Sequence, residues 1–146
     1  MASSSRSAPT SSSTRTVTFQ QYLWQDPSDP ERGWGLFGQV NVWDGNPTLT
    51  DWGLSLGVTG TGPIASRPKD RFGLGYFYLT PSDALIESLE QLDSPLLVRD
   101  EQGLEVFYTW QVGESWRLSA NEQVIEPGIR GTDVAYILGL RAFIGF

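Results

Sequence analysis

The stretch VAYILGLRAFIGF, residues 134–146, decides the fold class because its apolar side chains alternate along the chain. In an extended strand, successive side chains point to opposite faces. One face of this segment is wholly apolar or aromatic, and the other is mixed and carries the segment's single charge, Arg141. The apolar face consists of Val134, Tyr136, Leu138, Leu140, Ala142, Ile144 and Phe146. The pattern predicts a strand that presents one long, uncharged side.

Six further segments show this alternation and are separated by clusters of turn residues. A strand that crosses a membrane needs ~9–11 residues, whereas strands of soluble proteins average ~5–6. The seven segments have the longer length, so we predict an all-β fold of seven antiparallel strands. The six further segments are residues 16–25, 34–43, 51–60, 70–80, 103–112 and 116–125.

Composition excludes several classes of function. The chain has 146 residues, the size of one domain, with 17 acidic and 10 basic side chains and neither Cys nor His. The acidic balance argues against nucleic-acid binding, which needs clustered Lys and Arg. Catalytic triads, thiolate or His-ligated metal sites and disulfides are excluded. We therefore expect no enzyme, no cofactor and no metal. A glycosidase with paired carboxylates is the least favoured alternative, because the sequence does not place two carboxylates as a pair.

The two ends of the chain differ in character. Residues 1–15 are rich in Ser and Thr and contain no apolar run, so we expect a disordered tail there and a β domain over residues 16–146. We see no basic-then-apolar signal peptide at the start and no run of ~18 apolar residues. The longest connection, 81–102, has the one helical pattern, a short amphipathic turn with Asp83 as its expected N-cap.

Two β architectures compete. Both a soluble sandwich and a transmembrane barrel give each strand one apolar face. Strand length, the Gly-, Ser-, Thr-, Asn- and Gln-rich second face and aromatic residues near strand ends favour the barrel. Those aromatic residues are Trp34, Trp52, Tyr78, Trp110 and Trp116. The alternative is a soluble β-sandwich that binds carbohydrate through exposed Trp and Asn or Asp.

Glu122 breaks the pattern, because it occupies the apolar face of segment 116–125. A carboxylate that faces lipid near mid-strand is costly. The sequence leaves two explanations open: a bulge shifts the register of this strand, or this strand faces something other than lipid.

Two runs resemble the bacterial carbohydrate-selective porins. The first begins WGLFGQVNVWDGNPTLTDWGLSLGVTG at Trp34 and continues through an R-P-x-D turn into GLGYFY; the second is LEVFYTWQVGESWRLSANEQVIEPGIRGTDVAYILGLRAFIGF, residues 104–146. The resemblance covers residues 17–146. It implies the last seven strands of an antiparallel, up-and-down transmembrane β-barrel of sixteen strands, a sugar-permeable porin in the bacterial outer membrane. In that family the terminal aromatic belongs to the signal for the outer-membrane assembly machinery, a role that here falls to Phe146.

The chain departs from the family in length, since only the last seven strands are recognisable. Seven strands leave two open edges, and unpaired backbone groups are costly in hydrocarbon. We therefore expect a partial barrel that does not form a pore alone. Strand parity puts connections 26–33, 61–69 and 113–115 on the periplasmic side with Phe146. Connections 44–50, 81–102 and 126–133 then lie outside.

The resemblance implies passive diffusion of mono- or oligosaccharides through a polar lumen, with outer-membrane lipid around the barrel. For each lumen candidate the plain alternative is a solvated residue that only supports the wall. Arg67 and Asp70 are expected to form an ion pair that closes a turn. Sugar specificity stays open, as does a homo-oligomer. The lumen candidates are Asn41, Trp43, Arg71, Glu105, Gln111, Arg117, Asn121, Gln123 and Arg141.

Overall fold

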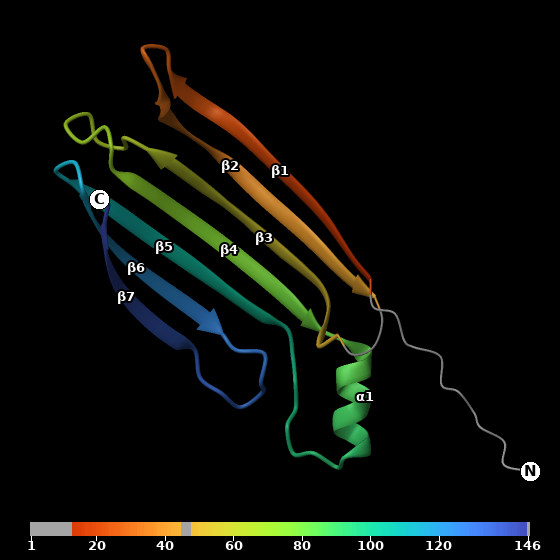
Figure 1. Cartoon of the computed structure of the whole chain (residues 1–146). Coiled ribbons are helices and arrows are strands. Elements are labelled where there is room, and N and C mark those ends of the chain that lie inside the picture. The colour runs from red at the N-terminus through yellow and green to blue at the C-terminus, as the bar shows by residue number, and fades with distance from the viewer. Residues whose placement is uncertain (1–12, 45–47, 146) are drawn as a thin grey trace, which may run out of the picture.

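The predicted strands form one antiparallel sheet. The computed structural model describes residues 13–44 and 48–145. The strands follow one another in the sheet in sequence order. Figure 1 shows them side by side in a single layer. They are β1 (Ser13–Asp26), β2 (Asp29–Asp44), β3 (Thr50–Thr61), β4 (Arg71–Pro81), β5 (Glu101–Val112), β6 (Trp116–Glu126) and β7 (Ala135–Ile144).

Within residues 13–44 and 48–145, no second layer packs on the sheet. Among the described residues no apolar side chain is buried, and on β7 Leu138 and Leu140 are 81% and 86% exposed. A soluble sandwich buries its apolar faces between two packed sheets. The structure therefore does not favour the soluble β-sandwich.

Strand register sorts the side chains into two faces, because paired residues of neighbouring strands lie on the same face. We call one the apolar face and the other the polar face. A row across the apolar face reads Leu36, Val58, Leu74, Val106, Glu122, Leu138. The adjacent row on the polar face reads Phe37, Gly57, Gly75, Glu105, Gln123, Ile137.

The first strand starts earlier than predicted. β1 begins at Ser13, because the long strand β2 provides backbone partners for three more residues. These pairs are Ser13 with Asp44, Thr14 with Trp43 and Arg15 with Val42. The expected tail boundary at residue 15 is therefore wrong by three residues, and the rest of that prediction lies outside the described residues. A register shift occurs between Tyr22 and Trp24, which explains why segment 16–25 fits the alternation less well than the others.

The connections sort to the two ends of the sheet as strand parity predicts. Those near the C-terminus join β1 to β2 at Pro27 and Ser28, β3 to β4 over residues 62–70, and β5 to β6 over 113–115. Gly113 has φ +65°, a conformation that glycine adopts without the steric cost of a Cβ. The connections at the opposite end follow β2, β4 and β6.

The connection between β4 and β5 contains α1 (Asp83–Gln91), which lies beyond the end of the sheet opposite the C-terminus (Figure 1). Its N-cap is Ser82, one residue before the expected Asp83. The Ser82 hydroxyl accepts a 3.1 Å hydrogen bond from the Leu85 backbone and donates one of 2.6 Å to the Thr48 carbonyl. No helix in the described part of the chain is both long and apolar enough to cross a membrane.

Candidate functional site

Aromatic side chains border the apolar face at both ends of the sheet. Trp34, Trp110 and Trp116 lie toward the C-terminal end, and Trp52 and Tyr78 toward the other, with ring centroids of that last pair 5.2 Å apart. Trp34 pairs with Gly60, eight residues along β3 from Trp52. At ~3.3 Å per residue the two bands are about 26 Å apart along the strand. For strands tilted ~35–45° this corresponds to about 20 Å across the membrane, somewhat less than the ~25 Å apolar band of outer-membrane barrels.

The polar face carries aromatic rings that lie over glycines of the neighbouring strand. A Cβ added to Gly73 would come within 2.2 Å of the Phe107 ring, and one added to Gly57 within 2.7 Å of the Phe37 ring. Phe77 covers Gly103 in the same way, at 2.6 Å. Because glycine has no side chain, these rings lie along the sheet instead of standing away from it.

All nine lumen candidates lie on the polar face, as the register shows. They do not form one site but three separate groups along the strands. The group at the α1 end is Asn41 and Trp43; the middle group is Glu105, Asn121 and Gln123; the group at the C-terminal end is Arg71, Gln111, Arg117 and Arg141.

The middle group is joined by direct contacts. Glu105 and Gln123 are cross-strand partners, and the Asn121 amide donates a 3.4 Å hydrogen bond to the Glu105 carboxylate. Asn121 also covers Gly139, where a Cβ would meet its side-chain oxygen at 2.2 Å. The carboxylate and the two amides therefore offer both acceptors and donors on one patch, the pairing that sugar hydroxyls require.

The group at the α1 end is already engaged by its neighbours. The Asn41 side-chain oxygen accepts 2.8 Å hydrogen bonds from the Thr16 hydroxyl and the Gln39 amide. The Trp43 ring lies 3.3 Å from the position that a Cβ on Gly53 would occupy. Asn41 thus has part of its acceptor capacity satisfied within the sheet.

In the C-terminal group, Gln111 is tied into a turn. Its amide donates to the carbonyls of Gly113 and Glu114 at 3.1 and 3.4 Å. The side chains of Arg71, Arg117 and Arg141 are exposed, and in the described part of the chain none of them has an ion pair or a hydrogen-bond acceptor. Three guanidinium groups are therefore free to contact solutes.

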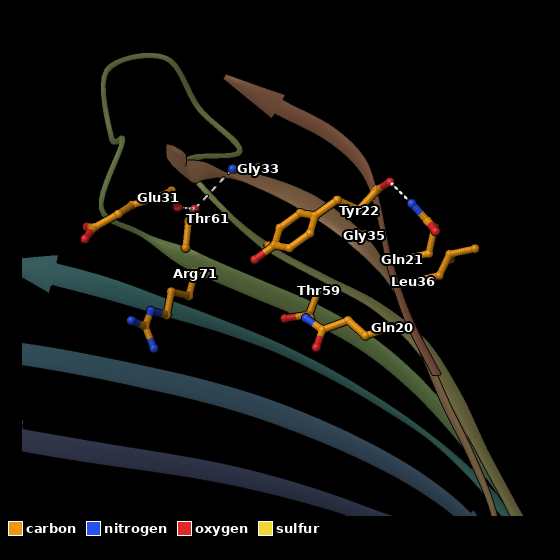
Figure 2. Close-up of a pocket in the computed structure, with 11 residues that line it drawn as sticks. Gln20, Gln21, Tyr22, Glu31, Gly33, Gly35, Leu36, Thr59, Thr61 and Arg71 are labelled. Atoms are coloured by element: carbon orange, nitrogen blue, oxygen red, sulfur yellow. Dashed lines mark hydrogen bonds between the residues drawn. The ribbon is translucent and has the colours of Figure 1, made fainter. Parts of the chain in front are cut away.

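Three residues of β1 and β3 that are not among the nine lumen candidates share a pocket with Arg71. Gln20, Tyr22 and Thr59 line it, and Figure 2 shows them on the same side of the sheet as Arg71, whereas Leu36 extends to the other side. The signal that could have found Gln20 and Tyr22 is their place at even positions of β1, opposite in phase to Val17 and Phe19. The less regular β1 pattern obscured it.

The predicted ion pair of Arg67 and Asp70 is confirmed in the turn between β3 and β4. Asp70 is 1% exposed and accepts hydrogen bonds from Arg67, from the Tyr108 hydroxyl at 2.7 Å and from the Gln111 backbone at 2.9 Å. The Arg67 hydrogen bond, with the other two donors, lowers the pKa of Asp70 from 3.8 to about 2 against the opposing effect of burial. This carboxylate fastens the turn to β5.

Glu122 stays on the apolar face, between Val106 and Leu138. The registers of β6 with β5 and with β7 contain no shift, so a bulge does not account for it. No hydrogen bond or ion pair reaches this carboxylate from the described residues. Likewise, no group of three His, Cys, Asp or Glu side chains in the described residues could hold a metal ion.

A single sheet with one apolar face between aromatic bands and one polar face is a segment of a transmembrane β-barrel wall. Residues 1–146 match the carbohydrate-selective porin OprB family, and the chain belongs to that family.

A solved structure supports the assignment. The chain is similar to Pseudomonas putida OprB, determined at high pH, with 26% sequence identity and a TM-score of 0.79. The match covers 90% of this chain and 34% of that one, so the chain spans about a third of the length of this relative. A comparison with curated proteins gives no significant match.

Proposed function

We propose that this chain forms part of the wall of a water-filled channel through which sugars diffuse passively across the bacterial outer membrane. Its lipid-side surface is the apolar face and its lumen surface is the polar face. Family membership supports the proposal, and so does the likeness to a porin over most of the chain. Family and fold indicate a channel rather than an enzyme.

One observation carries the proposal: the sheet exposes its apolar side chains without burying any in the described residues, and aromatic bands border them. Soluble proteins rarely expose contiguous apolar patches larger than a few hundred Å². In a bilayer the same surface is favourable, because lipid tails contact it and aromatic rings sit at the headgroup level.

The two edges of the sheet define what must complete the barrel. β1 and β7 run in the same direction, because an even number of antiparallel steps separates them. An all-antiparallel closure therefore needs an odd number of further strands, because the total must be even. A second copy inserted in the same orientation would not serve, because its β1 would run parallel to β7. Nine further strands, which the family resemblance implies, satisfy this condition and give sixteen.

We place the short turns with the C-terminus in the periplasm and the α1 connection outside, as barrels commonly do. The predicted insertion role of Phe146, and with it recognition by the assembly machinery, concerns a residue outside those that the structure describes. It stays part of the proposal. Outer-membrane lipid is then the partner of the apolar face, and mono- or oligosaccharides pass along the polar face.

Sugar contact falls on the middle group and on the arginines of the C-terminal group. Carboxylate and amide groups pair with hydroxyls, and the rings of Phe37 and Phe107 offer apolar surface to sugar C–H groups. Each contact is weak and exposed, which suits fast passage because a solute must leave as readily as it enters.

The test is liposome swelling with a restored barrel, in which the Pseudomonas putida porin supplies the strands that precede β1. Swelling with glucose and slower swelling with larger oligosaccharides is the expected result. Arg141→Ala should change the rate, while Arg15→Ala, on the apolar face, should not. A folded barrel that admits no sugar contradicts the proposal.

A further inference from the structure

Four consecutive strands place two arginines on either side of a pair of hydroxyls. In one row of the polar face, Arg71 of β4 neighbours Thr109, which neighbours Ser119, which neighbours Arg141 of β7. The Thr109 hydroxyl donates a 2.9 Å hydrogen bond to that of Ser119. With strands ~4.8 Å apart, the two arginine backbones are about 14 Å from each other. Only the short side chains of Thr109 and Ser119 lie between the two arginines, and we call these two hydroxyls the floor of the arrangement.

A third arginine completes the arrangement. Arg117 pairs with Gln111 and Phe143, one row nearer the C-terminal end of the same face. It is two residues from Ser119 on β6, so it lies diagonally next to Arg141. All three guanidinium groups are exposed and have no acidic partner among the described residues.

The acidic groups of the polar face on β5 lie farther toward the α1 end and are themselves engaged. Glu105 accepts from Asn121, and Glu101 accepts a 3.2 Å hydrogen bond from the Gly128 backbone. The other arginines of the described chain that form ion pairs, Arg32, Arg67 and Arg99, each meet a carboxylate within hydrogen-bond distance. Arginines without an ion pair therefore gather at the C-terminal end of the polar face, where Glu31, which lines a pocket with Arg71, is the nearby carboxylate on β2.

We infer that Arg71, Arg117 and Arg141, with the Thr109–Ser119 hydroxyls as floor, form a binding site for the carboxylate of acidic sugars. The inference deepens the proposed channel function, on which it rests, by naming a substrate class for one end of the lumen.

The chemistry of the site suits a sugar with a charged group. Guanidinium groups bind carboxylates through paired, charge-assisted hydrogen bonds, which are stronger than bonds between neutral groups. The floor hydroxyls can both donate to and accept from sugar hydroxyls. A neutral sugar would use only the floor and single guanidinium bonds, so the site should discriminate by charge before it discriminates by ring stereochemistry.

The first experiment uses the 146-residue chain itself in detergent micelles. Saturation-transfer NMR compares glucuronate with glucuronamide, the neutral amide of the same ring. We expect glucuronate to bind about fivefold more tightly, with the advantage lost in Arg71→Gln/Arg141→Gln and kept in Arg15→Gln/Arg130→Gln. Arg15 and Arg130 are exposed arginines at the opposite end of the sheet, on the apolar face and in the β6–β7 connection, so their joint loss matches the charge change.

Equal binding of the two ligands would overturn the inference, and so would a glucuronate advantage that survives the double substitution. Should the chain not regain strands in micelles, the restored barrel decides by the same comparison in liposome swelling. There, single Arg117→Gln and Arg141→Gln variants should slow glucuronate about threefold and change glucuronamide by a clearly smaller factor.

The barrel measurement also separates this inference from the channel proposal. Flux of both ligands at equal rates, unaffected by the arginines, removes the acidic-sugar site and leaves the channel standing. Binding that depends on the arginines, in a folded barrel that passes no sugar, supports the site and removes the channel.

Discussion

The Tyr108 hydroxyl donates a 2.7 Å hydrogen bond to the carboxylate of Asp70, 38 residues earlier in the chain. The bond joins the C-terminal half of β5 to the turn between β3 and β4. It approaches from the apolar face, where the Tyr108 and Trp110 rings are 5.0 Å apart and tilted by 54° to each other. The nine-residue connection 62–70 is thereby held against the sheet, although short turns are the rule at this end of a barrel.

Substitution of Asp70 should loosen this turn. In the restored barrel in detergent, we expect Asp70→Asn to lower the free energy of unfolding by about 2 kcal/mol, because Arg67 loses its charged partner. Tyr108→Phe, which removes one donor only, should cost about 1 kcal/mol. Urea unfolding followed by tryptophan fluorescence measures both; an unaltered midpoint for Asp70→Asn contradicts the structural role given to this carboxylate.

The same carboxylate makes stability depend on pH. Its folded-state pKa is about 2, below the ordinary value of 3.8, so its contribution is complete above about pH 4 and is lost as the pH falls toward 2. At ~1.4 kcal/mol per pKa unit the loss is about 2 kcal/mol. Unfolding free energies of the parent and of Asp70→Asn should converge between pH 4 and pH 2. A constant difference over that range would show that Asp70 is not the titrating group.

Glu122 should weaken the barrel in lipid. It lies between Val106 and Leu138 without a partner in the described residues, and a carboxylate facing hydrocarbon is unfavourable. We expect Glu122→Leu to raise the unfolding free energy by about 1–2 kcal/mol in bilayers. Glu105→Leu, on the polar face of the neighbouring strand, is the matched control and should give no gain. A loss of stability in Glu122→Leu would mean that this carboxylate meets a polar partner in the membrane.

The isolated chain should need detergent. Its apolar face is exposed and both sheet edges lack a neighbouring strand among the described residues, so in water the sheet should associate through either. Gel filtration without detergent should give aggregate in the excluded volume, and with detergent a protein–micelle peak. A sharp monomeric peak in plain buffer would contradict this expectation.

The strands and their faces could be predicted from sequence because alternation is a local property. The apolar face of β5, for example, follows directly from the two-residue spacing of Leu104, Val106 and Tyr108 in the sequence. No tertiary information is needed to recognise it. The helical pattern in the connection 81–102 was recognisable for the same reason, although it was expected to form only a short amphipathic turn. Its N-cap was not, because the choice between Ser82 and Asp83 depends on backbone geometry and on the Thr48 carbonyl.

The features that the sequence did not predict depend on which residues pair between neighbouring strands. The start of β1 at Ser13 follows from the length of β2, and the grouping of Arg71 with Arg141 follows from three successive strand pairings. The Arg67–Asp70 pair was predicted from spacing, whereas Tyr108 and the Gln111 backbone, which complete the surroundings of Asp70, come from another hairpin. The placement of nine lumen candidates on one face is confirmed by register; their contact with sugar stays a prediction.

The central claim is that one face of this sheet meets lipid and the other meets water. The chain has no native cysteine, so single cysteines on β5 can carry a spin label without background. In the restored barrel in bilayers, we predict that labels at positions 104 and 106 are relaxed by oxygen, which is concentrated in lipid. Labels at 105 and 107 should instead be relaxed by a water-soluble nickel chelate. Uniform accessibility along 104–107, or the opposite phase, would contradict the account.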